Sequence, residues 1–530
     1  MKLEVMDTLV SLFRHYVTTG NYESAKNIAE DLLKNKQLNI EFLLIYLEMA
    51  VMINDYDNAL KCIDLLVSAG YSPSACELCL QLVKFRLKKI NTVDEALNCA
   101  KILLSAGKLV EAEQVYVYAS ELAPDNLFVK YNWAKFYLDV GELPLAARMA
   151  DEIIKIDNLN SKAWSVYGNA LRMLGFELEA YNAHQKAISL DPESYESLLD
   201  LTATEVSRAK SDQDFEKSIK SSNQCLYVYL KYHYKFENLN ASVCKIKHDN
   251  SQAKYLIANG CVENIHSFIS FTDHVLDQLK NADSGYELKI SDSELKLIHE
   301  YGRSFFISNQ YLDVGPCVNS RLDWKLIANQ YKNSSPSLVV IDDFLSPEAL
   351  DYLRKFCYES KVWHKTYQHA YLGAFVDKGF VSKVHLKISE ELKIHLSDVI
   401  QNDRLEQLWA FKYDSILGKG INIHADFARI NLNFWITPDE YHLNKQNGGL
   451  IVYSEPAPRD WDYFDYNINS EKIYEYLGRH NSKSVTVPYK ANRAVLFDST
   501  LFHETDEIKF EDSYLGRRVN MTYLFGTQLT

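Results

Sequence analysis

The sequence has no long uninterrupted apolar segment. Hydrophobic residues make up 47% of its 530 residues and charged residues 24%, but no run approaches the roughly 20 apolar residues of a membrane-spanning helix. The segment MKLEVMDTLVSLFRHYV places Glu4 and Asp7 among its apolar residues, so it lacks the continuous apolar core of a signal peptide. We therefore expect a globular protein that does not enter a membrane.

The sequence also lacks an excess of basic residues and a regular cysteine spacing. Against 57 Lys and Arg stand 71 Asp and Glu, giving a formal charge of −14, so composition favours neither nucleic acid nor an anionic membrane as a partner. The nine cysteines do not have the spacing of a disulfide framework. A reducing, cytoplasmic location is the expectation.

A repeat of 34 residues occupies much of the first 200 residues. Its clearest copy is Ser161 to Ser194, and the segments Leu127 to Asn160 and Val93 to Asn126 keep the same phase upstream. The characteristic positions of the clearest copy are Trp164, Gly168, Gly175, Ala180, Ala187 and Pro192. The small residues allow paired helices to approach closely, and the glycines and the proline mark turns and helix ends. The pattern predicts stacked helix pairs.

Two more repeat units are indicated further upstream by Gly20, Ala25 and Ala59, offset from this phase by an extra helix around Ser74 to Lys89. The repeat resembles the tetratricopeptide (TPR) family. The resemblance implies a curved α-solenoid over residues 1–210 whose concave face holds an extended ligand or a partner protein.

The repeat phase is lost after residue 210. Residues 211–335 still have helical periodicity and are predicted to form a helical connector, with the polar segments SDQD and KNSSPS as boundaries. Residues 336–530 begin with a strand, a helix capped by Ser346 with Pro347 at its first position, and then several short strands. The expected strands are LWAFKY, ARINLNFWI, GGLIVY, SVTVPY, NRAVLF and RRVNMTYLFG. Many short strands predict a double-sheet sandwich or jelly roll, and the whole chain a multidomain α + β protein.

The segment INIHADFARINLNFW contains the first candidate ligands. In a strand, side chains two residues apart leave the same face, so His424 and Asp426 are expected to project together. A metal site needs a third ligand. His503 is the candidate because it follows an apolar strand directly, whereas His442 and His480 compete from polar segments without a strand to fix them.

A cationic residue near such a site could bind the carboxylate of a co-substrate. Arg517 and Arg518 stand together at the start of the last predicted strand. Strand alternation allows only one of them to point inward, and the pattern alone does not choose between them.

These motifs together resemble the 2-oxoglutarate- and iron(II)-dependent dioxygenases of the prolyl-hydroxylase-like group. The resemblance is carried by His424-Ala425-Asp426, by His503, by an arginine opening RVNMTYLF and by VVIDDFLSPEAL as an entry segment, and it covers the chain from Leu338 onward. It implies a double-stranded β-helix (jelly roll) that binds Fe(II) and uses 2-oxoglutarate and dioxygen as co-substrates.

The resemblance also assigns roles to residues. It implies that His424, Asp426 and His503 are the metal ligands, that Arg518 rather than Arg517 binds 2-oxoglutarate, and that Tyr413 assists. Trp435 stands where some members carry a further tyrosine. Asn431, Asn433 and Trp435 share one strand face and would line the pocket or, alternatively, only pack in the core.

The expected activity is hydroxylation of a C–H bond, because related halogen-installing enzymes lack the carboxylate ligand. The expected substrate is a peptide or protein docked by the helical repeats. Alternatives are the same chemistry on a small molecule or saccharide, or a non-catalytic TPR adaptor with an inactive oxygenase domain.

Overall fold

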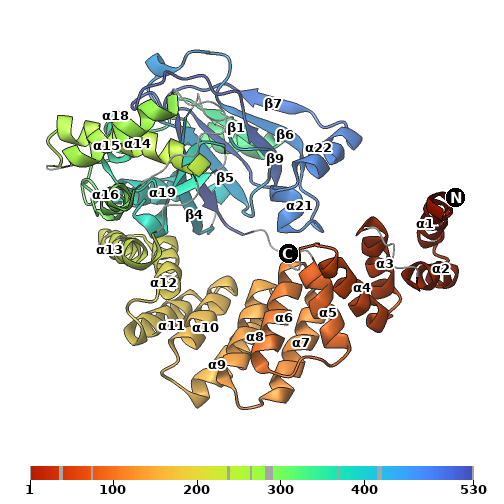
Figure 1. The fold of residues 1–530 in the computed structure, drawn as a ribbon. Helices are drawn as coiled ribbons and strands as arrows, with labels where there is room; N and C mark the ends of the chain where they lie inside the picture. Colours follow the sequence, from red (N-terminus) through yellow and green to blue (C-terminus); the bar gives the residue numbers. More distant parts are fainter. Residues whose placement is uncertain are drawn as a thin grey trace. The chain divides into compact units, whose positions relative to one another are not determined.

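The structure, a computed structural model, describes residues 2–34, 40–72, 76–234, 239–262, 265–280, 291–367, 369–400, 402–414 and 420–527. The chain divides into two compact units, Met1–Phe176 and Glu177–Thr530. In Figure 1 the first unit is entirely helical, and the second carries strands with helices around them.

The first unit is built from consecutive helices joined by short turns. They are α1 (Lys2–Thr18), α2 (Tyr22–Lys34), α3 (Ile40–Met52), α4 (Tyr56–Ser68), α5 (Glu77–Arg86), α6 (Val93–Ser105), α7 (Leu109–Leu122), α8 (Leu127–Asp139), α9 (Leu143–Ile156) and α10 (Ser161–Met173). Helices α6, α8 and α10 begin at the same position of successive 34-residue units, so the predicted helical repeat is confirmed for this segment.

The repeat has a local physical cause in each turn. Gly107 and Gly141 follow the first helices of two successive pairs with φ of 72° and 83°, a left-handed conformation that glycine adopts without steric cost. Five residues after each glycine, Ala112 and Ala146 are fully buried. Because alanine is small, the helices of a pair can approach closely there.

Helix α5 accounts for the offset of the first repeats. It lies where the sequence predicts an extra helix, although Ser74 itself is outside the described residues. The apolar cluster of α1 to α5 is separate from the cluster centred on α6 to α8.

The helices of the second unit include the predicted connector. They are α11 (Glu177–Leu190), α12 (Tyr195–Arg208), α13 (Asp212–Val228), α14 (Leu239–Ala258), α15 (His266–Lys280), α16 (Asp292–Arg303), α17 (Trp324–Asn333), α18 (Pro347–Glu359), α19 (Lys383–His395), α20 (Ser397–Ile400), α21 (Tyr463–Asn467) and α22 (Ser470–Arg479), with short turns η2 (Tyr229–His233), η3 (Val376–Lys378) and η4 (Asp439–Tyr441). The SDQD segment starts α13, where Ser211 and Asp214 form a capping box. The division between the two units falls after Phe176, inside the predicted 1–210 domain, and the boundaries at 210 and 335 stay predictions.

Two antiparallel sheets form the centre of the second unit. The strands are β1 (Leu338–Ile341), β2 (Lys365–Tyr367), β3 (Tyr371–Phe375), β4 (Leu405–Tyr413), β5 (Ile430–Trp435), β6 (Leu450–Pro456), β7 (Ser484–Val487), β8 (Ala494–Asp498), β9 (Leu501–Thr505) and β10 (Val519–Phe525). The larger sheet has the order β1-β8-β5-β10-β4-β3-β2 and the smaller one the order β7-β6-β9. The six expected strands are confirmed, and β2, β3 and β9 were not expected.

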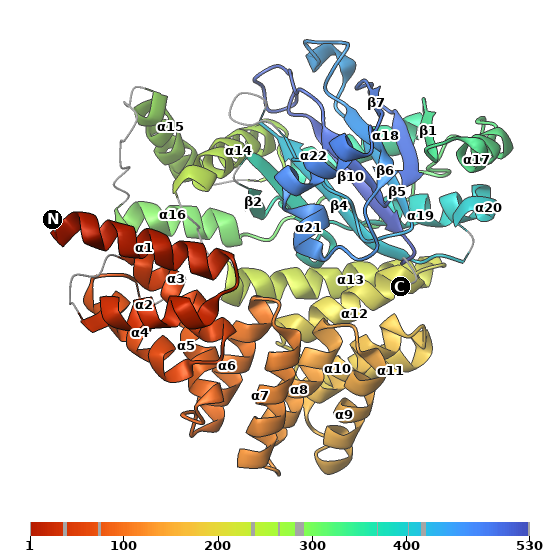
Figure 2. The same cartoon turned by 90° about the vertical axis from the view of Figure 1, so that its right-hand side faces the viewer.

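Each face of the larger sheet packs against a different layer. One face packs with α18 and α19 in a cluster that includes Phe356, Leu386 and Tyr523. The other contributes Trp435 and Phe497 to a cluster shared with the smaller sheet. Helix α12 contacts β4 and η3, and α13 contacts η3. Figure 2 shows both helices below β4. Strands β5 and β10 are therefore buried on both faces.

Candidate metal centre

Three candidate ligands meet between the two sheets. His424 pairs with His503 of β9 through two backbone hydrogen bonds, His424 N to His503 O at 3.0 Å and His503 N to His424 O at 2.8 Å. Asp426 donates its backbone N–H to the carbonyl of Ser499 at 3.1 Å. The expectation of one strand through the whole INIHADFARINLNFW segment is wrong, because β5 begins only at Ile430 and the partner for His424 lies in a distant strand.

The ligand atoms of this cluster converge. One ligand atom each from His424, Asp426 and His503 lies within 4.8 Å of the others, and this is the one such cluster of three within the described chain. His424 Nε2 is 3.9 Å from Asp426 Oδ1, and His503 Nε2 is 3.5 Å from Asp426 Oδ2.

The remaining ring nitrogens fix the orientation of both imidazoles. His424 Nδ1 lies 2.8 Å from the carbonyl of Asn422, and His503 Nδ1 lies 3.0 Å from the carbonyl of Leu501. A carbonyl only accepts, so the network assigns the proton to Nδ1 and leaves the Nε2 lone pairs directed at the cluster. This is the arrangement of histidines that bind metal ions in proteins. Two imidazoles and a carboxylate on one side suit Fe(II), with coordination positions left open.

The electrostatics favour the protonation states that metal binding requires. Burial lowers the pKa of His424 to about 4, and the neighbouring His503 adds to this effect. Burial alone would raise the pKa of Asp426, but His503, His424 and Asn431 keep it below its ordinary value. A neutral histidine beside an ionised carboxylate is therefore the stable state at neutral pH. The His424 and Asp426 side chains keep 15% and 12% exposure, so the site is not closed to solvent.

Arg518 is buried with neutral partners. Its Nε donates to the carbonyl of Gly448 at 2.7 Å and its Nη2 to that of Gly449 at 3.1 Å, while its Cζ lies 4.9 Å from the Tyr413 ring centre and 5.6 Å from that of Trp435. Among the described residues no carboxylate forms an ion pair with it, although Asp506 is close enough for its charge to act on the guanidinium. Burial accordingly lowers the pKa of the guanidinium.

Arg517 points the other way. Its Nη2 lies 3.0 Å from the carboxylate of Asp414, which is also 3.1 Å from Lys247 Nζ of α14. The two neighbouring arginines thus face opposite sides of the sheet, as strand alternation requires. Arg517 therefore forms an ion pair with Asp414, whereas Arg518 contacts the rings of Tyr413 and Trp435.

Asn431 and Asn433 are buried and lie on the strand face that also carries Trp435. Asn431 Nδ2 donates to Asp426 Oδ2 at 2.8 Å, so the amide contacts a candidate metal ligand directly. Asn433 pairs with Thr522 of β10 in the sheet register. The sequence-based interpretation did not assign a role to Asn520 or Thr522, although alternation from Arg518 places both on its face.

The competing histidines lie elsewhere. His442 is buried against the ring of Phe510, with 4.7 Å between ring centroids, and His480 caps the end of α22. Neither belongs to the cluster of potential metal ligands.

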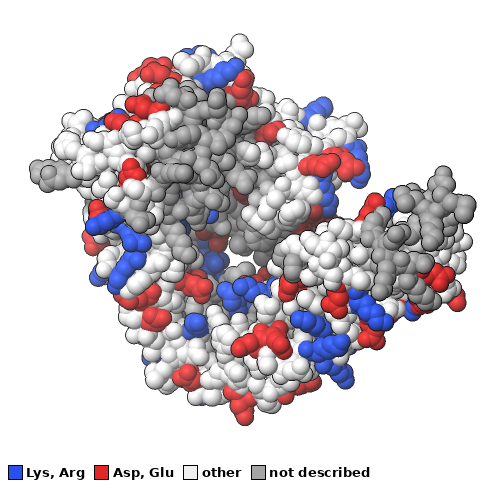
Figure 3. All heavy atoms as spheres, in the orientation of Figure 1, with Lys and Arg blue, Asp and Glu red and all other residues white. Residues whose placement is uncertain are grey.

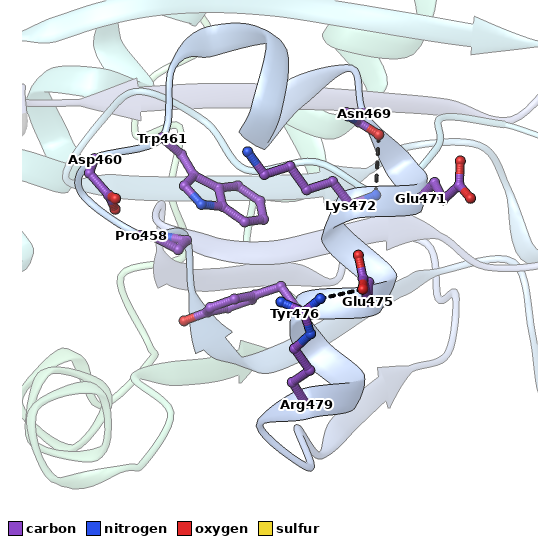
Figure 4. A pocket seen from close by; sticks show the side chains of 9 residues that line it. All are labelled: Pro458, Asp460, Trp461, Asn469, Glu471, Lys472, Glu475, Tyr476 and Arg479. Carbon is purple, nitrogen blue, oxygen red and sulfur yellow. Dashed lines mark hydrogen bonds and ion pairs between the residues drawn. The ribbon is translucent and has the colours of Figure 1, made fainter. Parts of the chain in front are cut away.

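A separate surface pocket of about 700 Å³ opens beside α22 (Figure 4). Lys472 lies over the ring of Trp461 at 4.7 Å and pairs with Asp465 at 2.7 Å, while Arg479 pairs with Glu475. The two cationic residues that line the pocket, Lys472 and Arg479, are therefore already paired with carboxylates. Behind it, Trp461 packs against Phe502, the residue that precedes His503, at 5.9 Å.

The chain was compared with known proteins. No family profile and no curated protein matches it. Among solved structures it is similar to MamA from Desulfovibrio magneticus RS-1, at 14% identity over 37% of this chain and 97% of that one, with a TM-score of 0.25. It is also similar to the C-terminal part of a TPR repeat-containing protein from Cytophaga hutchinsonii, at 15% identity over 52% and 96%, with a TM-score of 0.24. An O-GlcNAc transferase mutant from Thermobaculum terrenum matches at 16% identity over 28% of this chain and 27% of its own, with a TM-score of 0.24. These scores are low, so the proposals below rest on the geometry of the chain itself.

The surface charge and the hydropathy of the helices match what the composition indicates. On the face drawn in Figure 3, acidic and basic side chains are interspersed. No helix among the described residues combines the length and the apolar character needed to cross a bilayer.

Proposed function

We propose that this protein is an iron(II)- and 2-oxoglutarate-dependent dioxygenase that hydroxylates a C–H bond. The observation that carries the proposal is the combination of three converging ligand atoms with a buried arginine whose partners are all neutral. A buried cation that forms no ion pair with a carboxylate is costly, so an anion is the expected occupant beside it.

In this proposal the two sheets form a double-stranded β-helix around the site. His424, Asp426 and His503 would hold the ferrous ion through Nε2, one carboxylate oxygen and Nε2. When bound, the ion would supply the redox chemistry that couples oxidation of 2-oxoglutarate by dioxygen to oxidation of the substrate. The protein's own contribution is to hold both imidazoles in the rotation that directs Nε2 at the cluster, through the carbonyls of Asn422 and Leu501.

The far carboxylate of 2-oxoglutarate would bind at Arg518. The guanidinium is held between the rings of Tyr413 and Trp435 and by two backbone carbonyls, so its orientation is fixed before the anion arrives. Burial raises the pKa of Tyr413, which keeps its hydroxyl protonated and able to donate to the same carboxylate. Arg517 is not proposed for this role because it pairs with Asp414.

We propose that the substrate is a peptide or protein and that the helical repeats act as its docking scaffold, in the manner of TPR proteins. Stacked helix pairs present a continuous surface that suits an extended polypeptide. A small molecule or saccharide as substrate is the alternative within the same chemistry. A non-catalytic adaptor would need neither the three ligands nor a buried arginine beside them.

The decisive experiment measures succinate formed by the purified full-length protein with Fe(II) and 2-oxoglutarate under air. We expect turnover by the natural protein and at least about 100-fold less by Asp426→Ala, because a ligand is lost. Binding of Fe(II) and of 2-oxoglutarate is measured separately under nitrogen. If the natural protein binds neither, the adaptor interpretation replaces the enzyme.

A further inference from the structure

Three buried asparagines connect Arg518 to Asp426 by side-chain hydrogen bonds. Arg518 Nη1 lies 3.5 Å from Asn520 Oδ1, and Asn520 Nδ2 donates to Asn433 Oδ1 at 3.2 Å. Asn433 Nδ2 then donates to Asn431 Oδ1 at 2.6 Å. With the bond from Asn431 to the carboxylate, the series runs without a gap from the guanidinium to the candidate metal ligand. We call the three residues Asn431, Asn433 and Asn520 the amide chain.

The chemistry at the two ends determines the orientation of every amide. A guanidinium can only donate, and an ionised carboxylate can only accept. Each amide between them must therefore turn its oxygen toward Arg518 and its NH2 group toward Asp426. Thr522 fits this polarity, because its hydroxyl can donate to the same Asn433 oxygen at 2.8 Å. The assignment of oxygen and nitrogen in each side chain follows from the network rather than from its shape.

The position of the amide chain in the sheet makes it rigid. Asn431 and Asn433 lie on β5 and Asn520 on the neighbouring β10, with Thr522 opposite Asn433 in the register. All three asparagines are buried, Asn431 completely and the other two to 6% exposure. Buried amides are expensive to leave unpaired, so the strands that pair in register also hold the side chains in one arrangement.

We propose that the amide chain is a positioning device: Asn431, oriented by Asn433 and Asn520, fixes the rotation of the Asp426 carboxylate toward the metal and links that rotation to the occupant of Arg518. The inference rests on the proposed function and extends it to residues that touch neither metal nor co-substrate. Hydrogen-bonded partners of ligating carboxylates typically change metal affinity 10- to 100-fold when they are removed.

The three amide dipoles of the amide chain all point the same way between Arg518 and Asp426. Their negative ends face the guanidinium and their positive ends face the carboxylate, so each amide stabilises both terminal charges. An anion bound at Arg518 competes with the oxygen of Asn520 for the same N–H groups. Binding at one end therefore changes the polarisation of the donor that reaches Asp426, and the two sites should influence each other's affinity.

The test is titration of the full-length protein with Co(II) alone under nitrogen, followed by visible absorption, and its repetition at saturating 2-oxoglutarate. Variants are Asn431→Leu, which keeps the branching of the side chain and removes the amide, and Asn520→Leu, which breaks the chain at the arginine end. The matched control is Tyr523→Phe, which removes a buried β10 hydroxyl that bonds to the carbonyl of His385 on the other face of the strand.

We expect Asn431→Leu to weaken Co(II) binding roughly 10- to 100-fold and to shift the cobalt absorption bands, since the ligand carboxylate rotates. Asn520→Leu should weaken Co(II) binding less and reduce the effect of 2-oxoglutarate on it. Tyr523→Phe should change neither quantity. Circular dichroism checks the fold, and Asn431→Ser replaces Asn431→Leu if that variant does not fold.

Two outcomes would overturn the inference in distinguishable ways. If the natural protein binds Co(II) but Asn431→Leu binds it equally tightly with an unchanged spectrum, the amide chain has only a structural role, and the proposed function stands. If the natural protein binds no metal, both the proposed function and the inference are rejected.

Discussion

The two units of this protein differ most in what they bury. In the described part of the helical unit, the buried polar side chains are Gln81 and Ser165, and the rest of its buried set is apolar. The second unit buries charged and polar side chains such as Lys412, Arg518 and His503. Buried polar groups are costly unless they are paired, so a fold that keeps many of them has a use for them or a network that satisfies them. The core of the helical unit is therefore almost entirely apolar, whereas the core of the second unit also contains polar side chains that a binding site can use.

The two units also differ in their number of histidines. The helical unit contains one histidine, the exposed His15, whereas the second unit contains the other fourteen of the 15 in the chain. Several of these are buried, including His385 and His364. Substitutions in the helical unit should therefore leave metal and 2-oxoglutarate binding in the second unit unchanged.

The largest expected effect comes from the buried arginine of the site. Arg518→Met should weaken 2-oxoglutarate binding by at least about 30-fold, because truncating one partner of a buried charge pair costs about 2–5 kcal/mol. Isothermal titration calorimetry under nitrogen, with Co(II) present, measures this change. Co(II) binding itself should persist, since none of the three ligands is altered.

The neighbouring arginine is the matched control. Arg517→Met should leave 2-oxoglutarate binding intact and destabilise the second unit by about 3 kcal/mol, because the buried Asp414 loses one of its two cationic partners. Reversed results, with Arg517→Met abolishing binding and Arg518→Met not affecting it, would show that the wrong arginine is proposed.

Acid should destabilise the second unit and not the first. Burial lowers the pKa of His385 and of His364 to about 3. The unfolded chain, with ordinary pKa values near 6.5, then binds more protons than the folded one between pH 6.5 and pH 3. The contribution of these two histidines to stability is complete well above pH 6.5 and decreases as pH falls, by about 2 kcal/mol per histidine between pH 7 and pH 5.

Hydrogen exchange followed by mass spectrometry at pH 7 and pH 5 resolves the two units, after correction for the intrinsic exchange rates of the amides. Protection of the amides should decrease in the segments around α18, α19 and the larger sheet, and stay constant in α6 to α9. In the His385→Leu variant the loss of protection between pH 7 and pH 5 should be smaller. Equal losses in both units would contradict this explanation.

The helical unit was the easier part to predict because its information is local. Each 34-residue unit carries its own glycine turn, at Gly107 or Gly141, and its own buried alanines, so the helices follow without knowledge of distant contacts. The missed strands have no such signal. Strand β3 contains Gly373 and lies between two turns, and β9 is only five residues long.

The site shows where sequence periodicity stops being informative. The alternation rule placed His424 and Asp426 together, but the cause is a backbone bridge to His503, which no local pattern contains. The choice between Arg517 and Arg518 stayed open because both faces of β10 are buried, so neither face is marked by polarity. The two arginines differ only in their partners: Arg517 pairs with Asp414, whereas Arg518 donates hydrogen bonds to neutral groups.

Overpacking the helical unit should have a moderate effect confined to it. Ala119 in α7 is fully buried. Ala119→Leu should destabilise the first unit by about 1–3 kcal/mol, because the extra methyl groups force the helices apart. Differential hydrogen exchange measures the loss, and Co(II) affinity should not change. A weaker metal affinity would show that the two units do not act independently.

The smallest expected effect separates backbone conformation from packing. At Gly141 an added Cβ would meet no atom within 4 Å, but φ is +83°, so Gly141→Ala should cost about 1 kcal/mol from backbone strain alone. Gly478 in α22 has equally open surroundings without the positive φ, so Gly478→Ala should instead stabilise the second unit by about 0.5–1 kcal/mol. Chemical denaturation of the two variants measures both signs. Because neither substitution adds a steric contact, opposite signs can arise only from the φ angle, and equal signs would show that the glycine of the repeat turn is not required for its backbone conformation.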